Sequence, residues 1–172
     1  QGVIFSLNDL SLKTRTDGID NTEGLIESEG NLMIESFSGL ANALGRIICL
    51  NNFTIQTGKA LSNIKGIITG GNRGTISIGD EHLNNADNGL ISAGHLNVSA
   101  GFINNGNGGI FEADYMSLQA ACGTFDNENG QTTKWYMFTP EMDHEFCVYQ
   151  RTDPGYQFVH WIRTLGNITS TS

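Results

Sequence analysis

Acidic side chains are the first residues in this sequence that could perform chemistry. Paired carboxylates can bind a metal or act as general acid and base in enzymes that cleave polysaccharides. Near the start of the chain, the acids that could form such a stack are Glu27, Glu29 and Glu35. One repeat of 21 residues later, the same positions hold Ile48, Leu50 and Gln56. The acids therefore do not stack on successive repeats, which argues against such an enzyme.

Two short polar motifs resemble metal sites without completing one. In "MDHEF", Asp143 and Glu145 would share one side of a strand, since alternate residues of a strand point the same way; a solvated loop is the simpler interpretation. "DNENG", residues 126–130, lacks the central glycine and the closing glutamate of a calcium loop. The other candidate ligands, His82, His95 and His160, are isolated. We therefore expect no metal, no cofactor and no catalytic residue.

The three cysteines are Cys49, Cys122 and Cys147. Their number is odd and their spacing matches no metal site. A disulfide between Cys122 and Cys147 would be permitted in an exported protein and would clip the end of the chain to what precedes it. The alternative is that each cysteine packs as a small buried apolar residue.

Composition and charge restrict the class of protein. Charged residues make up 16% of the chain, with 22 Gly, only 2 Pro, and many Asn, Ser and Thr residues, which is typical of a β-rich surface. The net charge of −9 and the scattered basic residues argue against a nucleic-acid partner. No apolar run is long enough to span a membrane, and residues 1–25 do not resemble a signal peptide, so we expect the chain to begin at an internal cut point.

A repeated phrase organises residues 1–130. The pattern N-x-x-G-x-I recurs, with a one-residue expansion at "NADNGLI" and a decayed last copy at "NENGQT". Its aligned glycines are Gly24, Gly45, Gly66, Gly89, Gly108 and Gly130, at spacings of 21, 21, 23, 19 and 22 residues. Its asparagines include Asn21, Asn42, Asn63 and Asn105. We expect Gly and Asn here because corners need positive φ, and because aligned Asn side chains can hydrogen-bond in a ladder.

A second, alternating run follows each phrase and predicts a strand with one buried face. The expected inward pairs are Leu32/Ile34, Phe53/Ile55, Ile76/Ile78, Leu96/Val98 and Met116/Leu118. Two short strands in about 20 residues cannot enclose a core alone, so successive copies must stack. The sequence therefore predicts an all-β, right-handed parallel β-helix of about 20–21 residues per coil. A helical alternative fails, because each periodic glycine would cost about 1 kcal/mol in a helix.

The pattern changes over residues 131–164, which hold both prolines and eight of the fifteen aromatic residues. Alternation in "KWYMFT", "EFCVYQ" and "YQFVHWIR" predicts three strands, a β-hairpin extension, with a turn at "DPG". The extension could cap the open end of the solenoid. It could also form a binding surface, because Tyr and Trp supply much of the binding energy at interfaces. Residues 165–172 are polar again and predict a return to repeats.

The repeats resemble those of filamentous haemagglutinin and of the large effectors of contact-dependent growth inhibition, in particular "ISAGHLNVSAGFINNGNGGIFEADYMSLQA" and the N-x-x-G-x-I phrases. The aromatic stretch "YQRTDPGYQFVHWIRTLGNITSTS" resembles the point where such effectors return from a receptor-binding region to a second set of repeats.

This resemblance implies a non-enzymatic, monomeric segment of a filament that a two-partner outer-membrane transporter exports to the bacterial surface. The implied partner is an outer-membrane protein or lipopolysaccharide on a neighbouring bacterium, recognised for toxin delivery. The expected receptor-binding residues are Trp135, Tyr136, Phe138, Tyr149, Arg151, Tyr156, Trp161 and Arg163. One alternative is a structural spacer or a general adhesin of host surfaces or biofilms. A more remote one is an enzyme that acts on polysaccharides.

Overall fold

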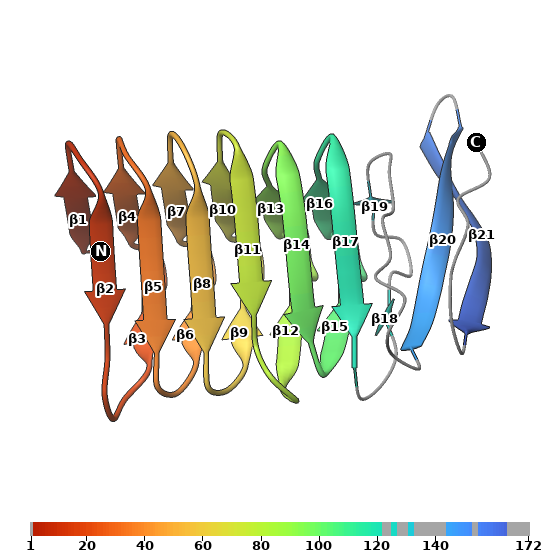
Figure 1. Ribbon diagram of the computed structural model, residues 1–172, viewed down its shortest axis with the longest axis horizontal. Helices are drawn as coiled ribbons and strands as arrows, with labels where there is room; N and C mark the ends of the chain where they lie inside the picture. The colour runs from red at the N-terminus through yellow and green to blue at the C-terminus, as the bar shows by residue number, and fades with distance from the viewer. Residues whose placement is uncertain (1, 122–124, 127–130, 133–143, 153–154, 165–172) are drawn as a thin grey trace.

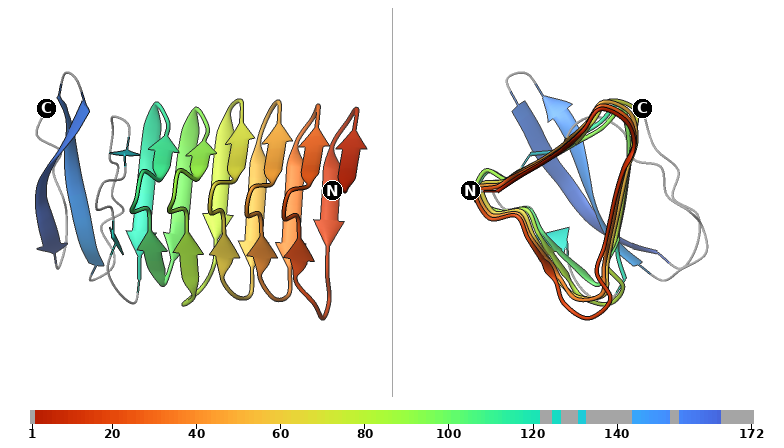
Figure 2. Two further views of the ribbon diagram at one scale, coloured as in Figure 1. Left: turned by 180° about the vertical axis from the view of Figure 1, so that it is seen from behind. Right: turned by 90° about the vertical axis from the view of Figure 1, so that its left-hand side faces the viewer.

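The computed structural model describes residues 2–121, 125–126, 131–132, 144–152 and 155–164, and after residue 121 it describes the backbone alone. Across these residues the secondary structure is all β. Parallel strands stack into a right-handed β-helix of about six turns, as the repeats predict. Figure 1 shows the coils side by side along the long axis, and Figure 2 shows that they superpose on a triangular outline when viewed along that axis.

Three parallel sheets form the sides of the triangle. Sheet A has seven strands and sheets B and C have six each. Sheet A comprises β1 (Val3–Ser6), β4 (Leu25–Ser28), β7 (Arg46–Cys49), β10 (Ile67–Gly70), β13 (Leu90–Ser92), β16 (Ile110–Glu112) and β19 (Gln131–Thr132). Sheet B comprises β2 (Leu10–Lys13), β5 (Leu32–Ser36), β8 (Phe53–Thr57), β11 (Arg73–Ser77), β14 (His95–Ala100) and β17 (Tyr115–Ala120). Sheet C comprises β3 (Ile19–Asp20), β6 (Leu40–Ala41), β9 (Leu61–Ser62), β12 (His82–Asn84), β15 (Phe102–Asn104) and β18 (Phe125–Asp126).

Each coil therefore contains three strands, one more than the sequence predicts. The additional strands are the short ones of sheet C, many of only two residues, such as Leu40–Ala41. So short a segment shows no alternation that could reveal it in the sequence. Its pairing with the neighbouring coils makes it a strand.

The core consists of columns of inward side chains that continue from coil to coil. All ten residues of the predicted inward pairs are buried, which confirms the predicted alternation. One pair is displaced along its column, because Ile76 lies beside Ile55 while Gly74 lies beside Phe53. Ile78 is buried directly after the end of β11 (Arg73–Ser77). The Phe53 ring fills the space that Gly74 leaves, since a Cβ on Gly74 would lie 2.2 Å from Phe53 Cζ.

A buried ladder of asparagine amides runs along one corner of the solenoid. Nδ2 of each asparagine donates to Oδ1 of the next at 2.7 Å, at sequence separations of 21, 21, 22 and 20 residues. Its members are Asn21, Asn42, Asn63, Asn85 and Asn105. Most of these amides also donate to backbone carbonyls; Asn42 Nδ2, for example, lies 3.2 Å from the carbonyl oxygen of Ile67. The predicted ladder is present, and it satisfies buried polar groups that would otherwise destabilise the core.

The repeat glycines are required for a different reason from the one predicted. At the corners it is the residue before the glycine that has positive φ: Glu23 at 55°, Leu44 at 56° and Lys65 at 54°. The glycine itself lies against the preceding coil, so that a Cβ on Gly45 would be 2.1 Å from the carbonyl oxygen of Asn21. Gly24 and Gly66 occupy the same position in their coils, and each is crowded by its own repeat asparagine. Close packing between coils, rather than backbone conformation, excludes side chains there.

The fifth copy of the phrase aligns one residue later than predicted. Ile110 pairs with Leu90, and Gly109 contacts Asn105 as Gly89 contacts Asn85. Gly109 is therefore the equivalent of Gly89, and Gly108 lies in the preceding turn with a φ of 83°. The phrase here has the same one-residue expansion as the copy before it. Two adjacent glycines in "NGNGGI" made the two alignments equivalent in the sequence.

The last described part of the chain breaks the parallel pattern. β20 (His144–Thr152) and β21 (Gly155–Thr164) pair antiparallel, with a register irregularity between Val148 and Tyr149. This is the expected β-hairpin extension, and it lies beyond the last coil at one end of the solenoid, with β20 close to β17 (Figure 1). The predicted strand "KWYMFT" and the expected return to repeats at residues 165–172 lie outside the described residues.

Candidate functional site

The carboxylates considered for catalysis are spread over the outer surface. Glu27 lies beside Ile48 and Glu35 beside Gln56, as the 21-residue offset predicts. The acids therefore do not stack in register. Within residues 2–121 and the other described segments, no three His, Cys, Asp or Glu residues lie together in a way that could hold a metal ion.

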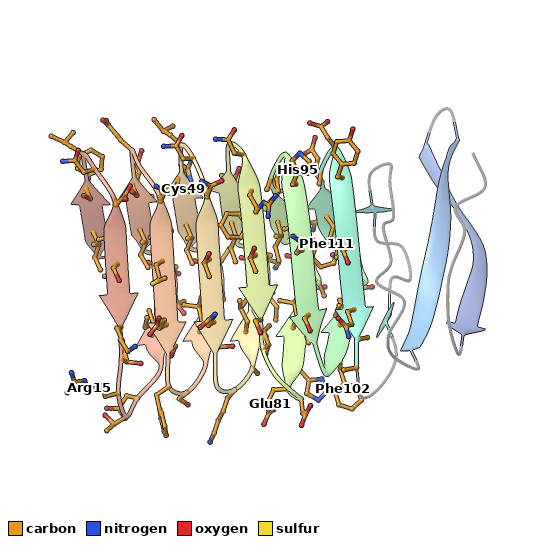
Figure 3. The ribbon with its side chains drawn as sticks, viewed as in Figure 1. Arg15, Cys49, Glu81, His95, Phe102 and Phe111 are labelled. Carbon is orange, nitrogen blue, oxygen red and sulfur yellow. The ribbon has the colours of Figure 1, made fainter. Side chains whose placement is uncertain are left out.

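His82 and His95 each stack on an aromatic ring of the next coil. The rings of His82 and Phe102 have centroids 4.5 Å apart and are inclined by 14°. Those of His95 and Tyr115 are 4.7 Å apart and inclined by 15°. Figure 3 shows that these stacks lie on opposite margins of the solenoid, with His95 on one and Phe102 on the other. The prediction that these histidines are isolated is wrong. Each histidine precedes its aromatic partner by 20 residues, which is close to the length of one coil.

An exposed polar ladder precedes the His95–Tyr115 stack at the corner between sheets A and B. Asn31 Nδ2 donates to Asp9 Oδ1 at 3.0 Å, and Asn52 Nδ2 donates to Asn31 Oδ1 at 2.8 Å. Asn52 Oδ1 in turn accepts a hydrogen bond from the backbone of Arg73. The register then continues from Arg73 to His95 and Tyr115. This corner presents polar and aromatic groups of successive coils in one line.

Two titratable groups have pKa values displaced from their ordinary range. Burial raises the pKa of the Cys49 thiol to about 11, so this cysteine is an unreactive part of the core and is not disulfide-bonded. Hydrogen bonds from the side chain and backbone of Thr22 lower the pKa of the exposed Asp20 carboxyl. Neither group lies in an arrangement that could activate a nucleophile or a general base. The proposed Cys122–Cys147 disulfide lies outside the part of the chain whose side chains are described.

Two grooves mark the outer surface of the early coils. A groove of about 430 Å³ crosses sheet C over small residues, among them Gly39, Ala41 and Ala60. A second groove, of about 460 Å³, follows the corner between sheets B and C. Its lining combines charged, amide and hydroxyl side chains with the exposed ring of Phe37. The repeat spacing did not predict this groove, because a groove depends on the open space between side chains of several coils.

The expected receptor-binding residues divide into two groups. Trp135, Tyr136 and Phe138 lie outside the described residues. The others lie in the hairpin, where the backbone register sets Tyr149 opposite Phe158, Arg151 opposite Tyr156, Cys147 opposite Trp161, and Glu145 opposite Arg163. The hairpin thus brings Tyr149, Arg151, Tyr156, Trp161 and Arg163 into one two-stranded unit.

Comparisons of the chain with protein-family models, with curated proteins and with solved structures found no match. Among the described residues, no helix is long and apolar enough to cross a membrane.

Proposed function

We propose that this chain is a non-enzymatic segment of a secreted cell-surface filament that binds a receptor on neighbouring bacteria. The receptor would be an outer-membrane protein or lipopolysaccharide, and its recognition would serve contact-dependent toxin delivery. The observation that carries the proposal is the change from stacked parallel coils to an antiparallel hairpin after residue 132. This change coincides with the aromatic-rich section of the sequence.

The solenoid itself supports the role of a rod. Its inward side chains and its asparagine ladder are committed to packing between coils. These committed side chains are not available to a receptor. Specific recognition of a receptor is then expected from the section that does not repeat, where Tyr and Trp can act as binding hot spots.

Binding to target cells tests this proposal. Alanine replaces Trp135, Tyr136, Tyr156 and Trp161 together, and the binding of labelled protein to intact target bacteria is measured with increasing concentration. We expect saturable binding by the original chain and a loss of about tenfold or more in affinity for the variant. Tyr115→Ala, which removes an exposed aromatic of the solenoid, is the matched control and should bind normally.

The second candidate function is that of a structural spacer or general adhesin whose hairpin only caps the solenoid. The position of β20 beside β17 and β18 favours this alternative. It predicts no saturable receptor, and a lower unfolding midpoint for the fourfold alanine variant. Normal folding together with unchanged cell binding would contradict the receptor-binding proposal, and unchanged stability would contradict the capping alternative.

A further inference from the structure

The groove at the corner between sheets B and C crosses successive coils at one level. The register aligns four outward residues of neighbouring strands along its floor: Lys13 of β2, Glu35 of β5, Gln56 of β8 and Ser77 of β11. The chain then leaves sheet B at Phe37, Gly58 and Gly79 in three consecutive coils, and these residues line the side of the groove. The groove thus spans four coils in the direction of the solenoid axis.

Phe37 gives the groove an uncovered aromatic surface. Phe37 is 65% exposed, so the ring is open to contact with a ligand. The equivalent positions in the next two coils are Gly58 and Gly79, so no side chain stands beside the ring there. A Cβ on Gly58 would lie 2.1 Å from the carbonyl oxygen of Phe37, and Gly79 has a φ of 52° that L side chains rarely adopt. The open space beside Phe37 is therefore built into the backbone.

The floor of the groove is polar but close to neutral. Lys13 Nζ donates to Glu35 Oε2, so the only two charges in the lining compensate one another. The side chain of Gln56 is exposed and offers both a donor and an acceptor, and the hydroxyl of Ser77 offers the same. Such a surface favours a ligand with many hydroxyl groups and no large net charge.

An extended peptide fits this groove poorly. Peptides that bind to sheets add a strand to an open edge through main-chain hydrogen bonds. β5 is already paired with β2 and β8, and β8 with β5 and β11, so no edge is free along the groove. A peptide therefore cannot bind along this groove by adding a strand to the sheet.

An extended carbohydrate chain suits a polar, nearly neutral groove that contains an exposed aromatic ring. Its hydroxyl groups can exchange hydrogen bonds with amide, carboxylate and hydroxyl side chains, and the apolar face of a sugar ring can pack on an aromatic ring. Strands of neighbouring coils lie about 4.8 Å apart, which is close to the length of one sugar unit in an extended glycan. Successive sugar units can then meet successive coils.

We propose that the groove lined by Lys13, Glu35, Phe37, Gln56 and Ser77 binds a neutral, extended glycan chain, with one sugar ring packed on Phe37. This site lies in the solenoid wall and is independent of the receptor-binding role proposed for the C-terminal section. It would give the rod itself an affinity for polysaccharide at a cell surface or in a matrix.

Titration with defined oligosaccharides tests the site. The probes are cellohexaose and chitohexaose, both neutral and extended, with heparin as an anionic comparison, and binding is measured by calorimetry. We expect saturable binding of at least one neutral hexasaccharide. Phe37→Ala should weaken it by about tenfold or more, Gln56→Ala by roughly threefold to tenfold, and Phe37→Trp should preserve it. Circular dichroism checks that each variant is folded, which we expect because both side chains are exposed.

Tyr115→Ala is the matched control, because Tyr115 is 52% exposed on the same sheet but lies outside the groove. It should bind the hexasaccharides normally. The proposal is overturned if the folded protein binds neither neutral hexasaccharide at millimolar concentration, if it binds heparin alone, or if Phe37→Ala binds as well as the original chain. None of these outcomes depends on binding to target bacteria, so the two proposals can fail separately.

Discussion

At the scale of single residues, two neighbouring positions at the corner between sheets C and A have opposite requirements. In the second coil these are Leu44, which has a φ of 56° and is 55% exposed, and Gly45, which lies against the preceding coil. A left-handed conformation costs an L residue such as leucine about 1–2 kcal/mol, and less for asparagine. Glycine therefore stands at the position that is crowded by the preceding coil, and a residue with a side chain stands at the position that has positive φ.

This arrangement predicts opposite effects of two substitutions. Leu44→Asn should increase the free energy of unfolding by roughly 0.5–1 kcal/mol, because asparagine tolerates the left-handed region and little packing is lost. Gly45→Ala should reduce it by roughly 2 kcal/mol or more, because the new Cβ would lie 2.1 Å from the carbonyl oxygen of Asn21. Urea denaturation measures both. Unchanged or increased stability of Gly45→Ala would contradict close packing as the reason for the repeat glycine.

At the scale of elements, β8 and β11 share one position of the core. Phe53 and Gly74 are register partners, and the large ring compensates for the missing side chain. The corresponding positions of β5, β14 and β17 hold Leu32, Leu96 and Met116, all buried. In this column a large residue in one coil compensates for the absence of a side chain in the next, so the residues of single coils differ in size.

Volume compensation predicts a non-additive pair of substitutions. Gly74→Ala alone should cost about 1–3 kcal/mol through the clash with the Phe53 ring. Phe53→Leu alone should cost about 1–2 kcal/mol, because it leaves a void over Gly74. The double variant should recover at least about 1 kcal/mol of the summed loss, since alanine fills space that leucine vacates. Additive losses in a denaturation series would contradict the compensation.

At the scale of the whole molecule, the solenoid is a stack of units that contact mainly their neighbours. Most strands of sheets A, B and C pair only with the strands one coil before and one coil after. Stability in such a protein is approximately a sum of coil contributions and interfaces between coils. The coil, and not the domain, is then the unit that can be removed.

Removal of one coil should leave a folded protein. Deletion of residues 25–45 joins Gly24 to Arg46, which is the register partner of Leu25, and it brings Leu10 and Leu12 beside Phe53 and Ile55. We expect a retained β-sheet circular dichroism spectrum and a single unfolding transition whose denaturant dependence is smaller, because less surface is buried. Deletion of residues 25–35 is the control. It should abolish folding, because it joins the strands out of register and directs apolar residues outward; equal behaviour of the two deletions would refute the modular description.

The repeat spacing, the alternating strands and the asparagine ladder could all be predicted from the sequence. The reason is that a parallel solenoid places residues about 21 positions apart in contact, so its long-range contacts follow from a regular spacing. The asparagines at 21, 42 and 63 form the ladder at that spacing. The receptor-binding residues stay a prediction, because no periodicity relates them to the rest of the chain.

Features that depend on the exact register and on the space between coils could be found only from the tertiary structure. It showed that close approach requires Gly45, that Gly109 and not Gly108 is the fifth repeat glycine, and that Phe53 packs over Gly74. It also brought Phe37 and Gln56 into one groove. An average period predicts which residues are neighbours. Distances of a few ångströms between atoms, which determine crowding and open space, follow only from the packed coils.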